Sequence, residues 1–207
     1  MNNTVLKDGI HYGLPELERD CWVRLLNGTL KGKDAMHTAY LANHGNNGIN
    51  LRTVVLRKVD TQQKTLCFHT DNRSGKWEEI ERYPHISWLF YDAAAKIQIR
   101  AAGLATLFTN NTIADEAWQK LNANSRKTYM GIIPPSQVVN FPTSGLDPNY
   151  DGITPSLPQT EFAKEYFGMV IVKIAWMEWL WLSSTGHRRA NFNYLPDNSF
   201  DAHWITP

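Results

Sequence analysis

Strand-forming segments follow one another along most of this chain, and only short helical segments separate them. Each strand segment is rich in β-branched residues or alternates apolar with polar residues. Several strands in succession with only short helices between them favour an antiparallel barrel over alternating βαβ units, so the sequence predicts a mainly β fold, a β-barrel with flanking helices. The predicted strands cover residues 51–58, 64–70, 86–91, 96–106, 167–182 and 187–194, and the short helices cover 74–83 and 112–121.

The N-terminal part of the chain has a helical pattern. Residues 14–26 place apolar side chains at helical spacing, Pro15 suits the first turn, and Gly28 can end the helix. A weaker pattern at 34–42, a helix or a loop, extends the expected N-terminal helical segment to about residues 14–42.

Length and loop content indicate one domain. The 207 residues fit a single domain and show no internal repeat, so we predict one domain over residues 1–207. A stretch rich in Pro, Gly and Asn at about 131–160 predicts a long loop, and long loops in compact domains are usually functional or flexible.

Charge and composition exclude several classes of function. Lys plus Arg number 21 and Asp plus Glu number 20, so a net charge of +1 offers no bulk attraction for nucleic acid or an anionic membrane. The N-terminus lacks the apolar core of a signal peptide, and Lys173 and Glu178 interrupt the longest apolar stretch. The two cysteines and seven scattered histidines show no metal-ligand spacing. We expect a cytoplasmic protein without a metal, membrane or nucleic-acid partner.

Polar residues around the predicted helix 74–83 indicate an anion site. Amides in the first turn of a helix have no partner within it and can hold an anion. Lys76 lies in that turn, where the helix dipole disfavours a cation unless an anion is nearby. Arg52 offers a planar fork for phosphate. Any one of these residues alone is more simply an exposed charge, but together they predict a phosphate site made by Arg52, His69, Thr70, Ser74, Gly75 and Lys76.

Several stretches of the sequence resemble one known family. In chain order they read RTVVLR, FHT, RSGKWEEI, PHISWLFYD and QIRAAG, all within residues 52–107. No single one is specific. In this order and spacing they resemble the pyridoxamine 5'-phosphate oxidase family of FMN-binding split barrels.

The resemblance implies which residues hold FMN. The strand that begins at Arg52 lines the flavin, and Arg52 and Lys76 reach its phosphate. Gln98 lies beside the isoalloxazine ring, and Gln137 contacts the cofactor from the neighbouring subunit. The predicted FMN-binding residues are Arg52, Thr53, Val54, Val55, Leu56, Arg57, His69, Thr70, Ser74, Lys76, Gln98 and Gln137.

The C-terminal stretch GHRRANF resembles the closing motif of the family, which implies that Arg188, together with Arg57, contacts substrate. A pair of polar residues on a terminal strand explains His187 and Arg188 equally well. The chain departs from the family in carrying Arg57 for Lys, Asn191 for Arg, Gly75 for Arg and Leu180 for Trp. These departures predict weak or no oxidation of pyridoxamine 5'-phosphate, unless a shift in register lets Arg189 replace the charge missing at Asn191.

The sequence therefore predicts an FMN-binding oxidoreductase that acts on an unidentified small molecule. By resemblance it is a homodimer with FMN at the subunit interface, and the Trp-rich segment 176–182 is expected to form core and dimer interface. The alternative is a non-catalytic protein that holds flavin, haem or another planar ligand on the same barrel. No catalytic residue is assigned, because flavin carries the redox chemistry itself. His69 is expected to be a satisfied core or rim histidine rather than a general base.

Overall fold

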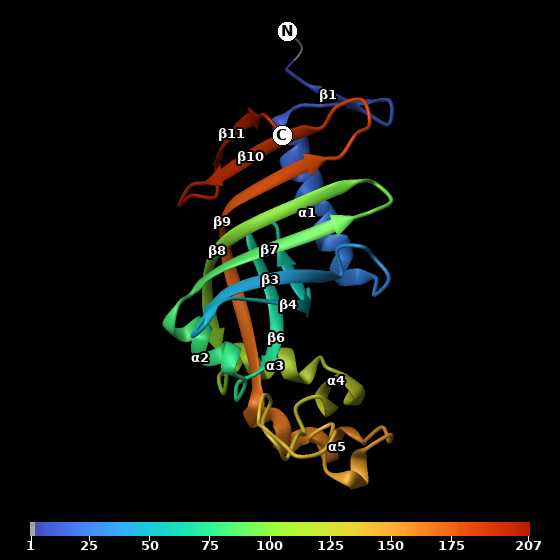
Figure 1. The fold of residues 1–207 in the computed structure, drawn as a ribbon, viewed down its shortest axis with the longest axis vertical. Coiled ribbons are helices and arrows are strands. Elements are labelled where there is room, and N and C mark those ends of the chain that lie inside the picture. The colour runs from blue at the N-terminus through green and yellow to red at the C-terminus, as the bar shows by residue number, and fades with distance from the viewer. Residues whose placement is uncertain (1–2) are drawn as a thin grey trace.

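One antiparallel sheet of nine strands organises residues 3–207, which the computed structural model describes (Figure 1). Its order is β11-β10-β9-β8-β7-β3-β4, while β6 pairs with both β5 and β9. A separate hairpin joins β1 (Val5–Lys7) to β2 (Ile10–Tyr12). The strands of the large sheet are β3 (Thr38–Gly45), β4 (Gly48–Val55), β5 (Lys58–Asp60), β6 (Thr65–Asp71), β7 (His85–Asp92), β8 (Ile97–Phe108), β9 (Phe167–Trp181), β10 (Arg188–Tyr194) and β11 (Phe200–Ile205). The predicted mainly β fold is confirmed.

The helices lie beside the sheet and at its lower end in Figure 1. Residues 109–166, between β8 and β9, form a lower lobe that holds α3 to α5 (Figure 1). None of the helices within residues 3–207 has the length and apolar composition needed to cross a membrane. The helices are α1 (Leu14–Leu30), α2 (Gly75–Arg82), α3 (Thr112–Gln119), α4 (Ala123–Lys127) and α5 (Leu157–Thr160), with short 3₁₀ turns at Pro148–Tyr150 and Glu161–Tyr166.

The predicted N-terminal helical segment 14–42 is wrong in its second half. Helix α1 continues past Gly28, and β3 begins at Thr38. Gly28 serves close packing and does not end the helix, since a Cβ there would lie 2.7 Å from the Met36 carbonyl group. The 38–45 segment is a strand because it pairs with β4 on one side and β7 on the other. The predicted loop at 131–160 is largely confirmed, although α5 forms at its end.

Strand β9 keeps the same pairing partner on one side but has two different partners, one after the other, on its other side. On one side it pairs with β8 over residues 169–181. On the other side, residues 167–173 pair with β6, whereas residues 176–181 pair with β10. The sheet therefore divides at β9, and its lower half continues into β6 while its upper half continues into β10 and β11.

A bulge marks the point of exchange. Ala102 of β8 pairs with Trp176, but the next residue, Gly103, pairs with Ile174, so Ala175 has no partner on β8. A Cβ on Gly103 would lie 1.9 Å from the carbonyl oxygen of Lys173 on β9. Only glycine therefore allows the two backbones to approach this closely.

Helix α1 closes one side of the sheet through both apolar and polar contacts. The Trp22 indole donates to the Tyr194 hydroxyl at 2.7 Å, and that hydroxyl donates to the Glu18 carboxylate at 3.0 Å. Lys64 forms an ion pair with the same carboxylate at 2.7 Å, and both side chains are largely buried. These contacts join α1 to β10 and to the start of β6.

Two apolar cores fill the molecule, one between the sheet and α1 and one in the lower lobe. Met177 and Trp179 of the Trp-rich segment are fully buried in the first, which confirms the core part of that prediction. The largest buried side chains of the two cores include Trp22, Phe68, Trp88, Phe90, Trp179 and Phe192 in the first, and Trp118 and Phe167 in the second.

Candidate functional site

Two cations and two hydroxyls meet at the start of α2. The Lys76 ammonium donates to the Thr70 hydroxyl at 2.9 Å, and the Thr70 and Ser74 hydroxyls lie 3.3 Å apart. Strand β6 supplies Thr70, the turn after it supplies Ser74, and the first turn of α2 supplies Lys76. Arg52 reaches the same region from β4, the edge strand beyond β3. We call these four residues the α2 cluster.

The electrostatics of the α2 cluster favour an anion. Burial, followed by the neighbouring Arg52 guanidinium, lowers the pKa of Lys76 below its ordinary value. Asp71 is close by, but Arg73 engages both of its oxygens, at 3.0 and 2.7 Å. An anion between Lys76 and Arg52 would relieve the repulsion between them.

Sequence reasoning missed Glu79, which contacts Arg52, and the two asparagines that hold Glu79. The guanidinium lies 3.5 Å from the Glu79 carboxylate, which also accepts hydrogen bonds from the Asn43 and Asn50 amides at 2.8 and 2.7 Å. Burial acts to raise the pKa of Glu79, but these amides and Arg52 outweigh it and hold the pKa below its ordinary value. No sequence pattern indicated this group, because its members come from β3, β4 and α2.

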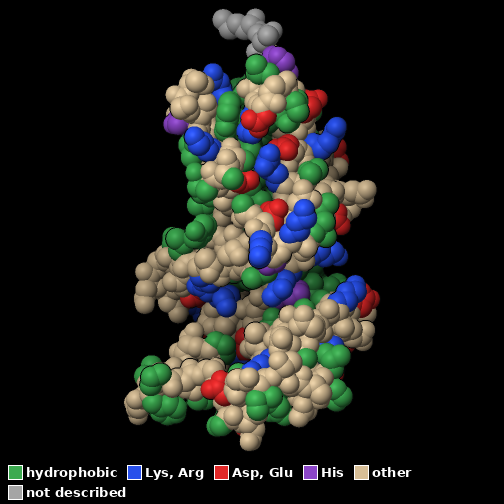
Figure 2. All heavy atoms as spheres, turned by 90° about the vertical axis from the view of Figure 1, so that its right-hand side faces the viewer, with side chains coloured by type: hydrophobic (Ala, Val, Ile, Leu, Met, Phe, Trp, Pro, Cys, Tyr) green, Lys and Arg blue, Asp and Glu red, His purple; other side chains and the backbone are tan. Residues whose placement is uncertain are grey.

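A second polar region lies on the opposite side of β6. A cavity of about 370 Å³ opens between the β4–β5 corner, β6, α3 and the C-terminal part of α1. Figure 2 shows a hollow between the upper sheet and the lower lobe, with Lys, Arg and His side chains along it. The polar residues that line the cavity are His37, Arg57, Lys58, His69, Glu116 and Lys120.

His69 is half-buried in the wall of this cavity, beside the Phe167 ring at 4.8 Å between centroids. Burial, followed by the charge of Arg57, lowers the pKa of His69 to about 3. Its Nδ1 atom is buried and has no hydrogen-bond partner. The prediction of a core or rim histidine is confirmed, but the histidine is not satisfied.

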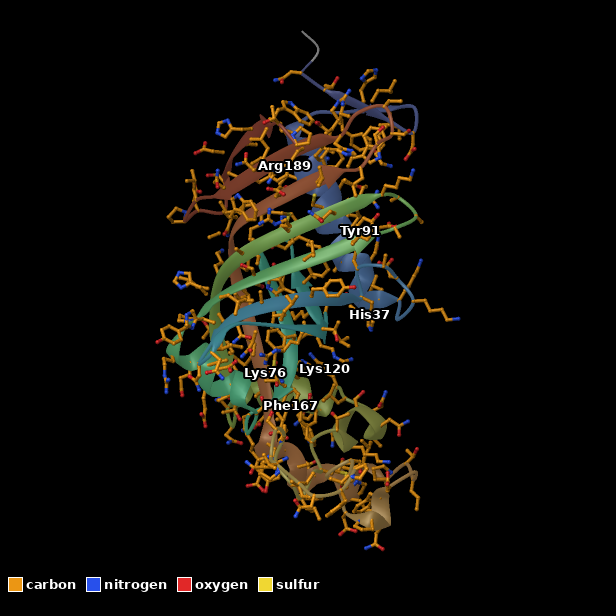
Figure 3. All side chains as sticks on the ribbon, viewed as in Figure 1. His37, Lys76, Tyr91, Lys120, Phe167 and Arg189 are labelled. Carbon is orange, nitrogen blue, oxygen red and sulfur yellow. The ribbon has the colours of Figure 1, made fainter. Side chains whose placement is uncertain are left out.

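Gln98 lies on the outer face of the sheet and away from the α2 cluster. Its cross-strand partner Tyr91 is in the upper half of the molecule, whereas Lys76 is at the lower end of the sheet (Figure 3). The strand register places Leu180 and Arg189 in the same row as Gln98.

In the next row of that face, Glu178 is 2% exposed and ion-pairs with Arg100 at 3.4 Å and with Arg189 at 2.5 Å. Asn191 pairs with Glu178 in register, and its side-chain oxygen is buried without a partner. The outer face therefore carries Arg189 beside the position at which the resemblance expected an Arg.

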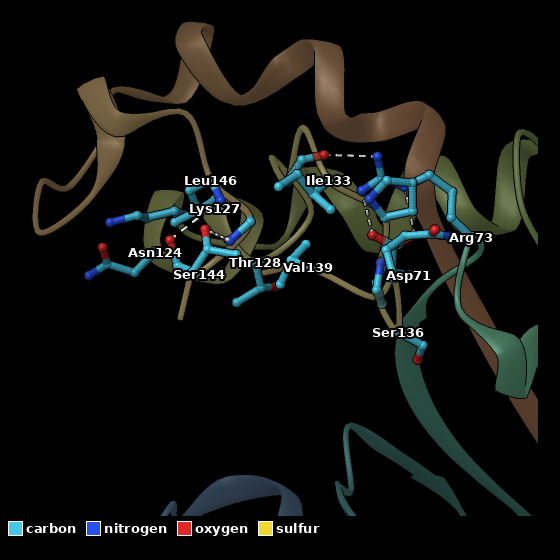
Figure 4. Close-up of a pocket in the computed structure, with 16 residues that line it drawn as sticks. Asp71, Arg73, Asn124, Lys127, Thr128, Ile133, Ser136, Val139, Ser144 and Leu146 are labelled. Atoms are coloured by element: carbon cyan, nitrogen blue, oxygen red, sulfur yellow. Dashed lines mark hydrogen bonds and ion pairs between the residues drawn. The ribbon is translucent and has the colours of Figure 1, made fainter. Parts of the chain in front are cut away.

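The remaining predicted residues are dispersed. Arg188 is exposed at the upper end, where its guanidinium donates to the carbonyls of Gly186 and His187. Gln137 lies in the 131–146 loop and lines a cavity of about 510 Å³, in which Arg73 donates to the Gly131 carbonyl at 2.8 Å (Figure 4).

The predicted FMN-binding residues of β4, and of the two positions after it, face different ways. Thr53 is exposed, Val55 is half-buried, and Val54 and Leu56 pack toward the core. The structure thus brings together Arg52, Thr70, Ser74 and Lys76, and separately Arg57 and His69. Within residues 3–207 no group of His, Cys, Asp or Glu could hold a metal ion.

Comparison with known proteins finds one family model that matches part of this chain. Residues 19–109 match the family model described as pyridoxamine 5'-phosphate oxidase, FMN-binding domain. The predicted family resemblance is confirmed. The matched stretch includes Arg52, His69, Lys76 and Gln98, while Gln137 and Arg188 lie outside it.

Solved structures share the split-barrel fold over nearly the whole chain. A pyridoxamine 5'-phosphate oxidase-related, FMN binding protein from Nostoc punctiforme PCC 73102 has a TM-score of 0.70 at 20% identity, covering 91% of this chain and 97% of that chain. PhzG from Burkholderia lata 383, solved in complex with tetrahydrophenazine-1-carboxylic acid, has a TM-score of 0.69 at 16% identity, covering 94% and 93%. No curated protein matches this chain.

The low pKa of His69 makes the protein sensitive to acid. Since the pKa is about 3 in the folded protein and about 6.5 in the unfolded chain, the unfolded chain binds the extra proton between these values, and stability falls as pH drops from 6.5. We expect this one group to remove about 2 kcal/mol of unfolding free energy between pH 6.5 and pH 5. Urea unfolding at the two pH values measures the loss.

The His69→Gln variant should lack this part of the pH dependence, while His85→Gln, at an exposed strand position, should keep it. Equal pH dependence in the wild type and His69→Gln would contradict the assignment.

Proposed function

We propose that the chain binds FMN, with the phosphate at the α2 cluster, and acts as an FMN-dependent oxidoreductase on a small molecule. The observation that carries this proposal is that two cations, Arg52 and Lys76, lie near each other at the start of α2, where Lys76 also contacts the Thr70 hydroxyl beside that of Ser74. The match of residues 19–109 to an FMN-binding domain supports the choice of ligand. A cytoplasmic location stays a prediction.

The residues present fit a phosphate ester. Lys76 and Arg52 supply charge, the two hydroxyls supply further hydrogen bonds, and the first-turn amides of α2 point in the direction that favours an anion. Bound FMN would supply the hydride and electron transfer, and the chain would supply position, polarity and access. Arg57 and His69, which line the neighbouring 370 Å³ cavity, would contact the substrate or the flavin ring.

A second copy of the chain would complete this site. Gln98, Arg189 and Asn191 share the outer face of the sheet, and that face lies apart from the α2 cluster within one chain. The same face carries exposed apolar side chains on the β3–β4 hairpin, among them Tyr40 and Leu51, the latter 68% exposed. Such a patch is typical of a protein interface. We propose a homodimer through this face, which would place Gln98 of one copy near the flavin of the other.

Affinity for FMN and riboflavin tests the phosphate assignment. Charge-assisted hydrogen bonds contribute about 1.5–3 kcal/mol each, so we expect FMN to bind at least about 10-fold more tightly than riboflavin in a fluorescence titration. Lys76→Gln should reduce the ratio of the FMN affinity to the riboflavin affinity, because it removes one cation from the phosphate site. Arg82→Gln, a matched loss of charge at the exposed end of the same helix, should leave it unchanged. Equal affinity of the wild type for the two flavins would refute the proposal.

Sedimentation tests the proposed homodimer. We expect the wild type to sediment as a dimer at micromolar concentration and Leu51→Glu to sediment as a monomer, because the substitution buries a charge in the interface. Val23→Glu places the same charge on an exposed position of α1 and should leave the dimer intact. A monomeric wild type in the presence of FMN would exclude the dimer.

The alternative function is binding of flavin or another planar ligand without turnover. An FMN-loaded protein whose absorbance is bleached by NAD(P)H or by an amine substrate supports the oxidoreductase. A flavin that stays oxidised with every donor supports the binding protein.

A further inference from the structure

We propose that Glu79 is a positioning residue of the phosphate site. It holds Arg52 of the edge strand β4 against helix α2, so that Arg52 and Lys76 act on the same anion. This inference rests on the proposed binding of FMN, and it assigns to Glu79 a role that no motif in the sequence indicated.

The Glu79 carboxylate is fixed by two amides from the β3–β4 hairpin. Asn50 donates to one carboxylate oxygen at 2.7 Å, and Asn43 donates to the other at 2.8 Å. Asn43 and Asn50 are themselves cross-strand partners. Gly45 makes room for this arrangement, since a Cβ there would lie 2.2 Å from the Asn50 amide nitrogen. The hairpin therefore holds the carboxylate from both of its strands.

The same carboxylate reaches Arg52 through one guanidinium nitrogen, at 3.5 Å. A guanidinium has five N–H donors in a fixed fork, so this single contact leaves most of them available to a phosphate. The side chains of Arg52 and Glu79 are 25% and 16% exposed, and solvent therefore weakens the contact only in part.

The position of Glu79 on α2 relates Arg52 to Lys76. Glu79 follows Lys76 by three positions on the helix, so the two side chains are neighbours on one face. Arg52 belongs to an edge strand, with β3 as its neighbour on one side, and a long side chain there has rotamer freedom unless something holds it. Through Glu79, the helix that carries one cation also fixes the other.

A carboxylate beside a phosphate site can also weaken phosphate binding, by competing with the phosphate for the same cation. If Glu79 competed with the phosphate for Arg52, its removal would strengthen binding of FMN. The two amide hydrogen bonds argue for positioning, because they occupy the carboxylate oxygens and keep its charge partly engaged. The direction of the change in affinity decides between the two.

Comparison of Glu79→Gln with a charge-matched control distinguishes a role of Glu79 in positioning Arg52 from an effect of net charge. The variant removes the ionic contact to Arg52 and turns an amide donor toward the donors of Asn43, Asn50 or Arg52. We expect the dissociation constant for FMN to rise about 10-fold, and that for riboflavin to change less than about 2-fold. Glu78→Gln is the matched control, since Glu78 is the exposed neighbour on α2 and its loss changes the net charge equally. It should leave both affinities within about 2-fold of the wild type.

Fluorescence-quenching titrations with both flavins measure these constants, and a loss of fold alone would weaken both ligands together. Tighter or unchanged FMN binding by Glu79→Gln, in a wild type that prefers FMN to riboflavin, overturns the positioning role and leaves the proposed function standing. A wild type without that preference overturns both.

Two further variants keep the test decisive. Glu79→Asp retains the charge, and therefore serves if Glu79→Gln does not fold. Glu79→Asp should weaken FMN binding by a smaller factor than Glu79→Gln does. An affinity of Glu79→Asp for FMN equal to that of the wild type would count against the positioning role. In a cycle with Arg52→Lys, the effects of Glu79→Gln and Arg52→Lys should be less than additive, because one residue acts through the other. Full additivity would contradict the inference.

Discussion

Strand β9 changes its pairing partner midway along its length, and this exchange divides the large sheet into two halves. The lower residues of β9 pair with β6 and its upper residues with β10, while β8 follows it on the other side throughout. The exchange needs a bulge, and the bulge needs a glycine at 103 because the backbones there leave no room for a Cβ. One strand thus links a lower half, which carries the α2 cluster, to an upper half, which carries the outer-face residues.

This division separates the predicted FMN-binding residues within one chain. Strand β6 delivers Thr70 and His69 to opposite sides, one toward Lys76 and the other toward the cavity beside Arg57. Strands β8, β9 and β10 deliver Gln98, Glu178 and Arg189 to another face. A phosphate site and a polar face that are separate in one chain become parts of one site only if two chains associate, and this makes the homodimer central to the proposed function.

The sequence predicted most strands, and it grouped the four residues of the α2 cluster that the structure brings together, because both depend on local pattern. It missed β3, whose residues form a strand only through their pairing with β4 and β7, and β11, which pairs with β10 at the edge of the sheet. It also missed Glu79, because its partners Asn43 and Asn50 come from distant positions in the chain. Likewise, only the strand register shows that Arg189 and not Arg188 shares a row with Gln98.

The proposed function requires an anion between Arg52 and Lys76. A crystal structure of the protein loaded with FMN tests this claim most directly, through the position of the phosphorus atom. We expect phosphate density at the start of α2, within hydrogen-bond distance of the Lys76 ammonium and the Arg52 guanidinium. Phosphate density among Arg57, Lys58 and Lys120, in the cavity on the other side of β6, would contradict it.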